Sequence, residues 1–433
     1  MQIKTKHNFI IYFFTGILIS FFLFQTVHNR AIDQTFKDQP PRYMNVINYW
    51  LEDGLINNYG LWPRDSEAMR FNNIPSEKTQ KKTFYRNDGM GYLHPSYLLQ
   101  KIHYSIFNKI SYQLYIYQNQ FYLIISSIIL SLIALKILLS HNVNIKNAYL
   151  MAFTCQLLFL TFPVNLFYYW GAYPTAISSI FVLLFINLIY EIQKNPKNIN
   201  SKLKIIMVLT VFFLTYTALY VAILFLLFFI LTYLLLDKKF LNFKTISLII
   251  FLPFILSLLL FFFQIFIAKA NSSTELLGSS FNFRSGLDGD RSYYYSYLNL
   301  IFHRIRESVY IYQWYELMLF SIFSILIYIS LNVYKAAYSK NIEKIEKQNI
   351  FIGIISFGAY VPYALLFTQS TVIHAKVFDP YLIIPFIIVS FANLLGLIES
   401  KSSFKGFFCF IFFGIGIFIS LRNLRLYSIE YPL

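Results

Sequence analysis

The sequence predicts an all-α polytopic membrane protein. Charged residues make up 13% of the 433 residues and hydrophobic residues 57%, whereas soluble domains carry about 25% and 45–50%. The apolar residues gather in long runs, and these observations exclude a soluble enzyme, a disordered protein and a disulfide-stapled protein. The formal net charge of +16 comes from cations scattered through short loops. Orientation in a membrane explains such cations, so no nucleic-acid partner is predicted.

The apolar runs give the candidate membrane spans, because a spanning helix needs about 20 apolar residues. These runs cover 8–27, 118–140, 148–165, 172–192, 205–236, 245–268, 314–335, 350–368, 380–398 and 405–421. The first has Lys4 and Lys6 before it and no small-residue cleavage site after it. We therefore interpret it as a retained signal anchor.

The run 205–236 is the ambiguous one, since about 48 Å of helix is too long for one span and short for two. If it crosses twice, turning near 217–219, the lysines of the short loops collect on the N-terminal side. The opposite short segments then hold only Lys376, Arg422 and Arg425. The positive-inside rule therefore favours about eleven spans, with the N-terminus in the cytoplasm and the C-terminus outside.

This topology divides the chain into five parts: a first span (1–27), a long outer loop (28–117), a group of spans (118–268), a second outer loop (269–312), and C-terminal spans with a short outer tail (313–433). The cytoplasmic loops are all short. Any chemistry is therefore expected on the outer face of the plasma (inner) membrane.

The first outer loop carries two stretches with helical spacing of apolar residues. Across 41–58 the apolar positions are Met44, Ile47, Leu51 and Leu55, and Gly54 with the following Asn-rich cluster ends the pattern. A second stretch follows His94 and Pro95, with Leu98, Leu99, Ile102 and Ile106 on one face. Two such helices are expected either to lie at the lipid–water boundary or to cap the bundle.

Apart from Lys136, Glu191 and Glu316, which lie near span ends, the interiors of the spans contain no ionisable residues. Ion-coupled transporters keep charged residues at membrane depth, so this pattern counts against that class. The histidines assigned to the outer side show no H-x-x-x-H pair, so the sequence does not support a metal site.

Three motifs resemble those of the GT-C membrane glycosyltransferases, which include the protein O-mannosyltransferases and the aminoarabinose lipid A transferases. The sequence DQPPRY at 38–43 resembles their acidic motif and first loop helix, and GYLHPSYL at 91–98 is similar to their "Y-x-x-P-P-L" stretch. The sequence HAKVFDPYL at 374–382 is similar to the "H-x-R-Y-L-L-P" entrance of a late span. The chain departs from the family at Gln39, at the single Pro95 and at Lys376, which stands where an arginine is common.

The resemblance implies a sugar donor on a polyprenyl phosphate and a lipid, glycan or protein acceptor. Inverting transfer needs a base for the acceptor hydroxyl, and the motif implies Asp38, with Asp33 as reserve. An N-cap of the first loop helix is the alternative role of Asp38. Cations must meet the departing phosphate. The implied substrate-binding residues are His94, Arg304, Arg306, His374 and Lys376. The plan is shared by metal-dependent and metal-independent enzymes, so the resemblance fixes no cofactor and leaves a divalent metal open.

Two other classes remain open. A polysaccharide polymerase or ligase of the O-antigen type has similar spans, but its largest loop usually lies late in the chain, whereas here it follows the first span. A lipid-linked glycan flippase or transporter would predict internal repeats and broken helices at the midplane. No clear inverted repeat is visible, and Pro253 and Pro362 are the main breakers within spans.

Overall fold

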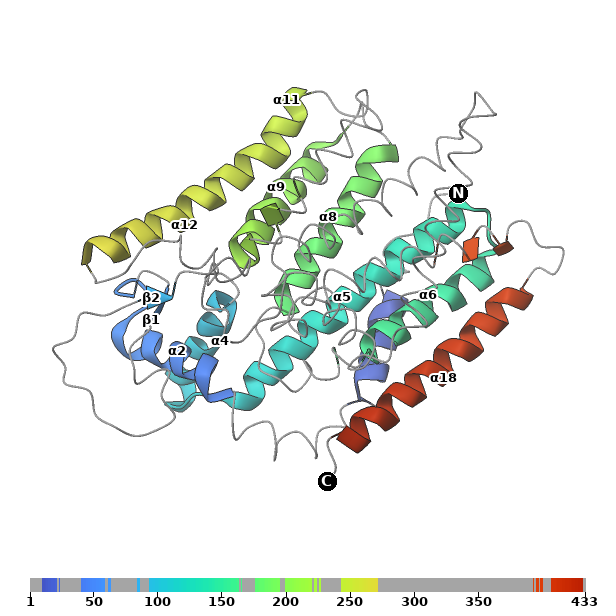
Figure 1. Cartoon of the computed structure of the whole chain (residues 1–433), viewed down its shortest axis with the longest axis horizontal. Coiled ribbons are helices and arrows are strands. Elements are labelled where there is room, and N and C mark those ends of the chain that lie inside the picture. The colour runs from blue at the N-terminus through green and yellow to red at the C-terminus, as the bar shows by residue number, and fades with distance from the viewer. Residues whose placement is uncertain are drawn as a thin grey trace, which may run out of the picture.

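The polypeptide forms a bundle of long helices with two shorter helices at one end (Figure 1). The computed structural model describes residues 10–21, 23, 40–58, 61–63, 84–85, 93–162, 165, 176–194, 199–219, 222–223, 226, 243–271, 392, 395–396, 398–399 and 406–430. The first described helix is Ile10–Phe21. The labelled elements are α2 (Pro40–Asp53), β1 (Trp62–Pro63), β2 (Phe84–Tyr85), α4 (His94–Phe107), α5 (Tyr112–Ser140), α6 (Ile145–Leu160), α8 (Ala176–Lys194), α9 (Ser201–Thr217), α11 (Phe243–Ile246), η2 (Ser247–Phe251), α12 (Leu252–Asn271) and α18 (Phe407–Glu430).

Three helices in the described part of the chain are long and apolar enough to cross a membrane. They are α5, the continuous segment Lys244–Ala268 that runs from α11 into α12, and Phe407–Arg425 within α18. Ile10–Phe21, α6 and the first part of α8 are shorter apolar helices. The predicted helical class with membrane-type spans is therefore confirmed.

Side-chain caps and helix breaks set several of these bounds. Three helices begin after a side chain that accepts a bond from an unpaired N–H of the first turn: Ser111 before α5, Asn144 before α6 and Asn200 before α9. α9 ends at Thr217, because Ala218 leaves the helical region with φ −147° and ψ 62°. This end coincides with the turn predicted near 217–219.

A short π-helical segment, η2, lies just before Pro253 of α12. Pro253 has no N–H to continue an α-helical ladder. In η2 the backbone hydrogen bonds span five residues instead of four: the N–H of Leu252 donates to the carbonyl of Ser247. The helix therefore continues past Pro253 into α12 instead of breaking there.

Contacts between the helices fix their relative directions. Ser126 of α5 lies 2.6 Å from Ser179 of α8, and Lys136 further along α5 pairs with Glu191 further along α8, so α5 and α8 are parallel. α6 and α18 are also parallel, since α18 contacts the start of α6 through Cys409 and the end of α6 through Ser420. α9 packs beside both η2 and α12 (Figure 1) and runs parallel to them.

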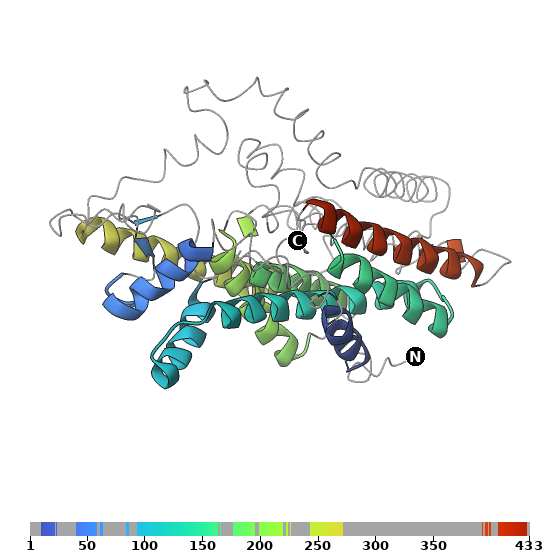
Figure 2. The same ribbon diagram turned by 90° about the horizontal axis from the view of Figure 1, so that it is seen from below.

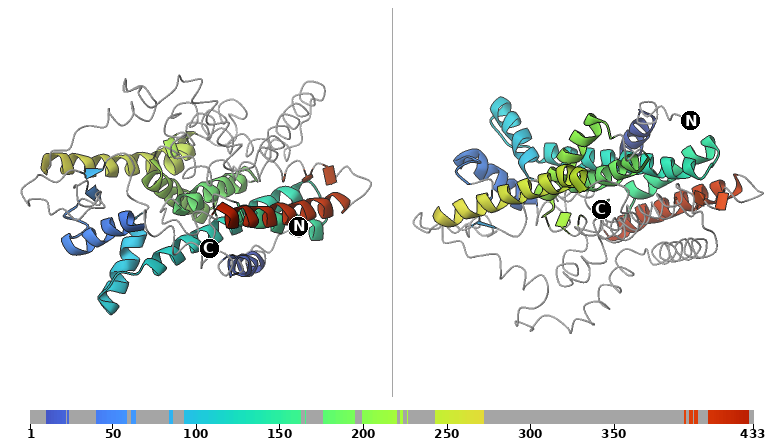
Figure 3. Two further views of the ribbon diagram at one scale, coloured as in Figure 1. Left: turned by 60° about the horizontal axis from the view of Figure 1, so that its bottom comes forward. Right: turned by 90° about the horizontal axis from the view of Figure 1, so that it is seen from above.

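One end of the bundle carries α2, α4 and the β1–β2 pair, which Figures 2 and 3 show beside the start of α5 and the end of α12. We call this the cap end. α2 falls where the spacing predicts a helix, and Gly54 ends it with a positive φ of 89°. Its buried face consists of Met44, Val46, Ile47 and Trp50. The two-residue antiparallel pair, Trp62 with Tyr85 and Pro63 with Phe84, was not predicted.

Two boundaries differ from the predicted ones. α5 starts at Tyr112, inside the segment 28–117 predicted as loop. α18 continues to Glu430, so the segment predicted as a short outer tail is largely helical. The predicted spans 314–335 and 350–368 and the second outer loop 269–312, apart from the last residues of α12, lie outside the described residues.

Candidate functional site at the cap end

A cluster of aromatic rings joins the two cap helices to the bundle. The ring of His94, at the start of α4, lies between Trp50 of α2 and Tyr216 of α9, with centroid distances of 5.5 and 5.4 Å. Tyr97, one turn further along α4, meets Trp50 edge to face at 5.9 Å. Contact between these large rings joins α2 to α4, and α4 to the end of α9.

Hydrogen bonds fix the orientation of the rings. The indole Nε1 of Trp50 donates to the carbonyl of Leu61 at 3.0 Å. The Tyr216 hydroxyl lies 3.3 Å from Nδ1 of His94 and accepts a bond of 3.0 Å from Nε2 of Gln264 in α12. His94, Tyr216 and Gln264 therefore form a polar chain from the cap helices into the bundle.

α4 turns its polar side toward the protein and its apolar side away from it. Ser96, Tyr97 and Gln100 are buried, and Gln100 exchanges two bonds with the backbone of Ser111 at the start of α5. The predicted apolar face is the exposed one: Leu98, Ile102 and Ile106 are 57%, 60% and 66% exposed. The spacing of the apolar residues identified this face, but whether the face is buried or exposed depends on what packs against α4.

His94 is the one predicted site residue within the described part of the chain. Asp33, Asp38, Arg304, Arg306, His374 and Lys376 lie outside the described residues. One residue, Gln39, separates Asp38 from Pro40, where α2 begins. Among the described residues, no group of three or more His, Cys, Asp or Glu side chains is arranged to hold a metal ion.

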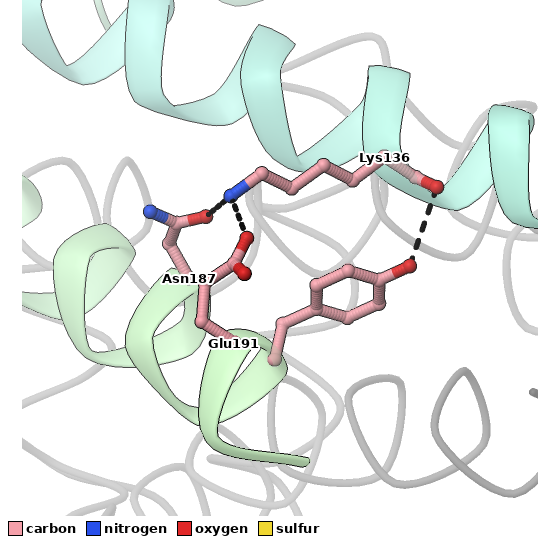
Figure 4. A network of polar contacts seen from close by, with 4 residues as sticks. Lys136, Asn187 and Glu191 are labelled. Atoms are coloured by element: carbon pink, nitrogen blue, oxygen red, sulfur yellow. Dashed lines mark hydrogen bonds and ion pairs between the residues drawn. The ribbon is translucent and has the colours of Figure 1, made fainter. Parts of the chain in front are cut away.

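A second polar cluster lies away from the cap end, where α5 packs on α8 (Figure 4). The ammonium group of Lys136 pairs with the carboxylate of Glu191 and donates to Oδ1 of Asn187 at 2.7 Å. The Tyr190 hydroxyl donates to the Lys136 carbonyl at 3.2 Å. Lys136 is only 9% exposed. The sequence identified both charged residues but not their pairing, because 55 positions along the chain separate them.

Tyr216→Phe tests the polar chain of the cap end. Phenylalanine keeps the ring contacts, but the hydroxyl partner of His94 and Gln264 disappears. We expect the free energy of unfolding to fall by about 1–2 kcal/mol, because two partly buried groups lose a hydrogen bond. Unfolding in detergent measures the change.

Tyr104→Phe is the matched control, since Tyr104 is an exposed tyrosine of α4. Its effect should stay within about 0.5 kcal/mol. An equal effect of the two substitutions would contradict a role for the Tyr216 hydroxyl in joining α4 to α9 and α12.

Comparison of this chain with protein-family models, with curated proteins and with solved structures finds no match.

Proposed function

We propose that this chain is an integral membrane glycosyltransferase. It moves a sugar from a polyprenyl-phosphate donor to an acceptor on the outer face of the membrane, by the inverting mechanism that the motif resemblance implies. The observation that carries the proposal is the cap end. There, a helix begins within each of two glycosyltransferase-like motifs, at 38–43 and 91–98, and the two helices pack at the same end of a bundle of apolar helices.

The helix directions support the topology that puts the cap end outside. In the predicted topology, α5 and α8 run from the outer face to the cytoplasmic face of the membrane. The opposite direction is predicted for α6, α9, α12 and α18. The parallel pairs α5 with α8, α6 with α18 and α9 with α12 all agree with these directions. If 205–236 crossed only once, α9 and α12 would run in opposite directions. This arrangement supports two crossings, and with them the topology of about eleven spans.

The exposed face of α4 supports an interfacial position for this helix. Leu98, Ile102 and Ile106 point away from the protein, and Lys101 is an exposed cation on the same helix. An apolar face flanked by cations is typical of helices that lie in the headgroup region. A donor whose lipid stays in the membrane would then have its phosphate close to the cap end.

In this mechanism Asp38 takes the proton from the acceptor hydroxyl as it attacks the anomeric carbon. The bond from the anomeric carbon to the phosphate oxygen breaks, and the phosphate leaves with the electron pair. Lys376 and His374, with Arg304 and Arg306 behind them, neutralise the charge that develops on the phosphate. His94 orients the start of α4 beside the donor.

Lys376→Ala is expected to weaken donor binding by about 10- to 100-fold, because a charge-assisted hydrogen bond to phosphate is lost. Acceptor binding should change little. Lys376→Arg keeps the positive charge and is the matched control. Titration of each variant with a polyprenyl-phosphate sugar and with an acceptor measures both affinities, and an equal loss for both ligands would argue against a phosphate role.

A turnover assay tests the function itself. The purified chain in lipid nanodiscs is given a panel of polyprenyl-phosphate sugars and membrane extract as the source of acceptors. Transfer releases polyprenyl phosphate and moves label from the donor to another molecule. A flippase would instead move labelled lipid between leaflets with the sugar–phosphate bond intact, and a polymerase would consume pyrophosphate-linked oligosaccharides.

A further inference from the structure

α5 carries a row of buried polar side chains in the part that lies nearest the cap end. Tyr115, Asn119, Tyr122 and Ser126 are spaced four, three and four residues apart and so lie on one face of the helix. All four are buried. We call this row the α5 polar stripe. Further from the cap end, the same face continues with Leu130 and Ile133, which are apolar.

Most of the stripe is satisfied by protein partners, but its central amide is not. Ser126 contacts Ser179 of α8, and the Tyr122 hydroxyl accepts a bond from Gln118. Asn119 is 1% exposed, yet neither its amide nitrogen nor its amide oxygen has a hydrogen-bond partner. The same is true of Oε1 of Gln118 and Nε2 of Gln120, two buried atoms on either side of it. Among the described residues, no other run of neighbouring side chains gathers so many unpaired polar atoms.

The position of Asn119 makes this arrangement costly. It lies about 10 Å along α5 from the first residue, within a helix apolar enough to cross a membrane. Lipid offers no partner to a buried amide, so membrane proteins pair such groups or use them for binding. Gln156 in α6 shows the paired case: its amide bonds to the Tyr12 carbonyl, to Thr15 and to Ser127.

The chemistry of the unpaired atoms selects the ligand. A side-chain amide offers donors and an acceptor next to each other, which matches neighbouring hydroxyl groups. The stripe contains no cation, whereas a phosphate site is built from cations or a helix N-terminus. The tyrosine rings add apolar surface with a hydroxyl at its edge.

We infer that the α5 polar stripe binds the saccharide of the lipid-linked donor, with Asn119 as its central contact. This inference rests on the proposed function, because it takes the donor class from there. It places sugar recognition on α5 and leaves the phosphate to the cations already named.

Binding of matched lipids tests the inference. The full-length chain in nanodiscs is titrated with farnesyl phosphate and with farnesyl phosphate esterified to hexoses, N-acetylhexosamines and pentoses. We expect tighter binding of at least one sugar-bearing lipid than of farnesyl phosphate. Asn119→Leu should weaken the binding of that lipid about tenfold and leave the affinity for farnesyl phosphate unchanged. Asn119→Ala should do the same if leucine does not fit.

Gln156→Leu is the matched control, because it also replaces a buried side-chain amide by a leucine. It should lower the unfolding temperature, since three bonds to protein are lost, and keep the preference for the sugar-bearing lipid. Asn119→Leu should not lower the unfolding temperature, because the amide has no protein partner to lose. The methyl glycoside of the preferred sugar shows whether the stripe binds a free saccharide or only a lipid-linked one.

Three results overturn the inference: equal binding of sugar-bearing and sugar-free lipids by the unaltered chain, an unchanged preference in the Asn119 variants, or a loss of stability in them as large as that of Gln156→Leu. Failure of the proposed function has a different signature. If the sugar preference disappears in Asn119→Leu and the unaltered chain transfers no sugar, the saccharide site is supported and the transferase function is wrong. If Asn119→Leu transfers the sugar at an unchanged rate, the transferase function is supported and the saccharide site on α5 is wrong.

Discussion

Asp38→Asn is expected to abolish glycosyl transfer while the protein stays folded and still binds its donor. A carboxylate that removes the proton from the acceptor hydroxyl contributes about 10²–10⁴-fold to the rate. Asparagine has nearly the same shape but cannot accept that proton. The fold should be unaffected, because α2, which begins at Pro40, is held by buried side chains such as Met44, Ile47 and Trp50.

Two further variants make the test specific. Glu52→Gln removes a carboxylate from α2 whose partner is Asn48 on the same helix, at 2.7 Å in an exposed position, and transfer should continue at its normal rate. Asp33→Asn tests the reserve base. Normal turnover in Asp38→Asn, with loss in Asp33→Asn, would move the role to Asp33. Normal turnover in both would remove this segment from the mechanism.

Glu191→Gln is expected to give the largest loss of stability. It leaves the ammonium group of Lys136, which is 9% exposed, without its carboxylate partner. Breaking a buried ion pair by removing one partner costs about 3–5 kcal/mol. We expect the lower end of this range, since Glu191 is about one third exposed and Asn187 still accepts a bond from Lys136. Chemical unfolding in detergent measures the change.

A double substitution separates the ion pair from the other contacts of the two side chains. Lys136→Met in the Glu191→Gln background removes the unpaired charge and should restore most of the lost stability. Glu52→Gln, at the exposed carboxylate of α2, should change stability by no more than about 0.5 kcal/mol. If Glu191→Gln were as mild as Glu52→Gln, the pair would not hold α5 against α8.

Sequence reasoning located the helices well where apolar spacing and helix-ending residues act locally. Gly54 ends α2 near the predicted position, and His94 and Pro95 begin α4. α9 ends at Thr217, in the segment where charge counting favoured a turn. The start of α5 was placed too late, because the stretch from Tyr112 is polar and aromatic and was assigned to the preceding loop.

The candidate site could be predicted only in part. The motif resemblance selected His94, which the fold brings against Trp50 and Tyr216. The polar chain through Gln264 was not predicted, because α4, α9 and α12 are far apart in the sequence. Asn119 was also missed, since the three neighbouring amides at 118–120 look like ordinary neutral polar residues until the side chains packed around them are known.

By itself the sequence determined the class of the protein and the positions of most described helices. These properties follow from composition, local periodicity and the distribution of charge, which act over a few residues or over whole loops. Only the tertiary structure decided that Lys136 meets Glu191, that α4 turns its polar side inward and that Asn119 is buried without a partner. Such outcomes depend on which helices become neighbours, and packing between distant segments sets the environment of each face.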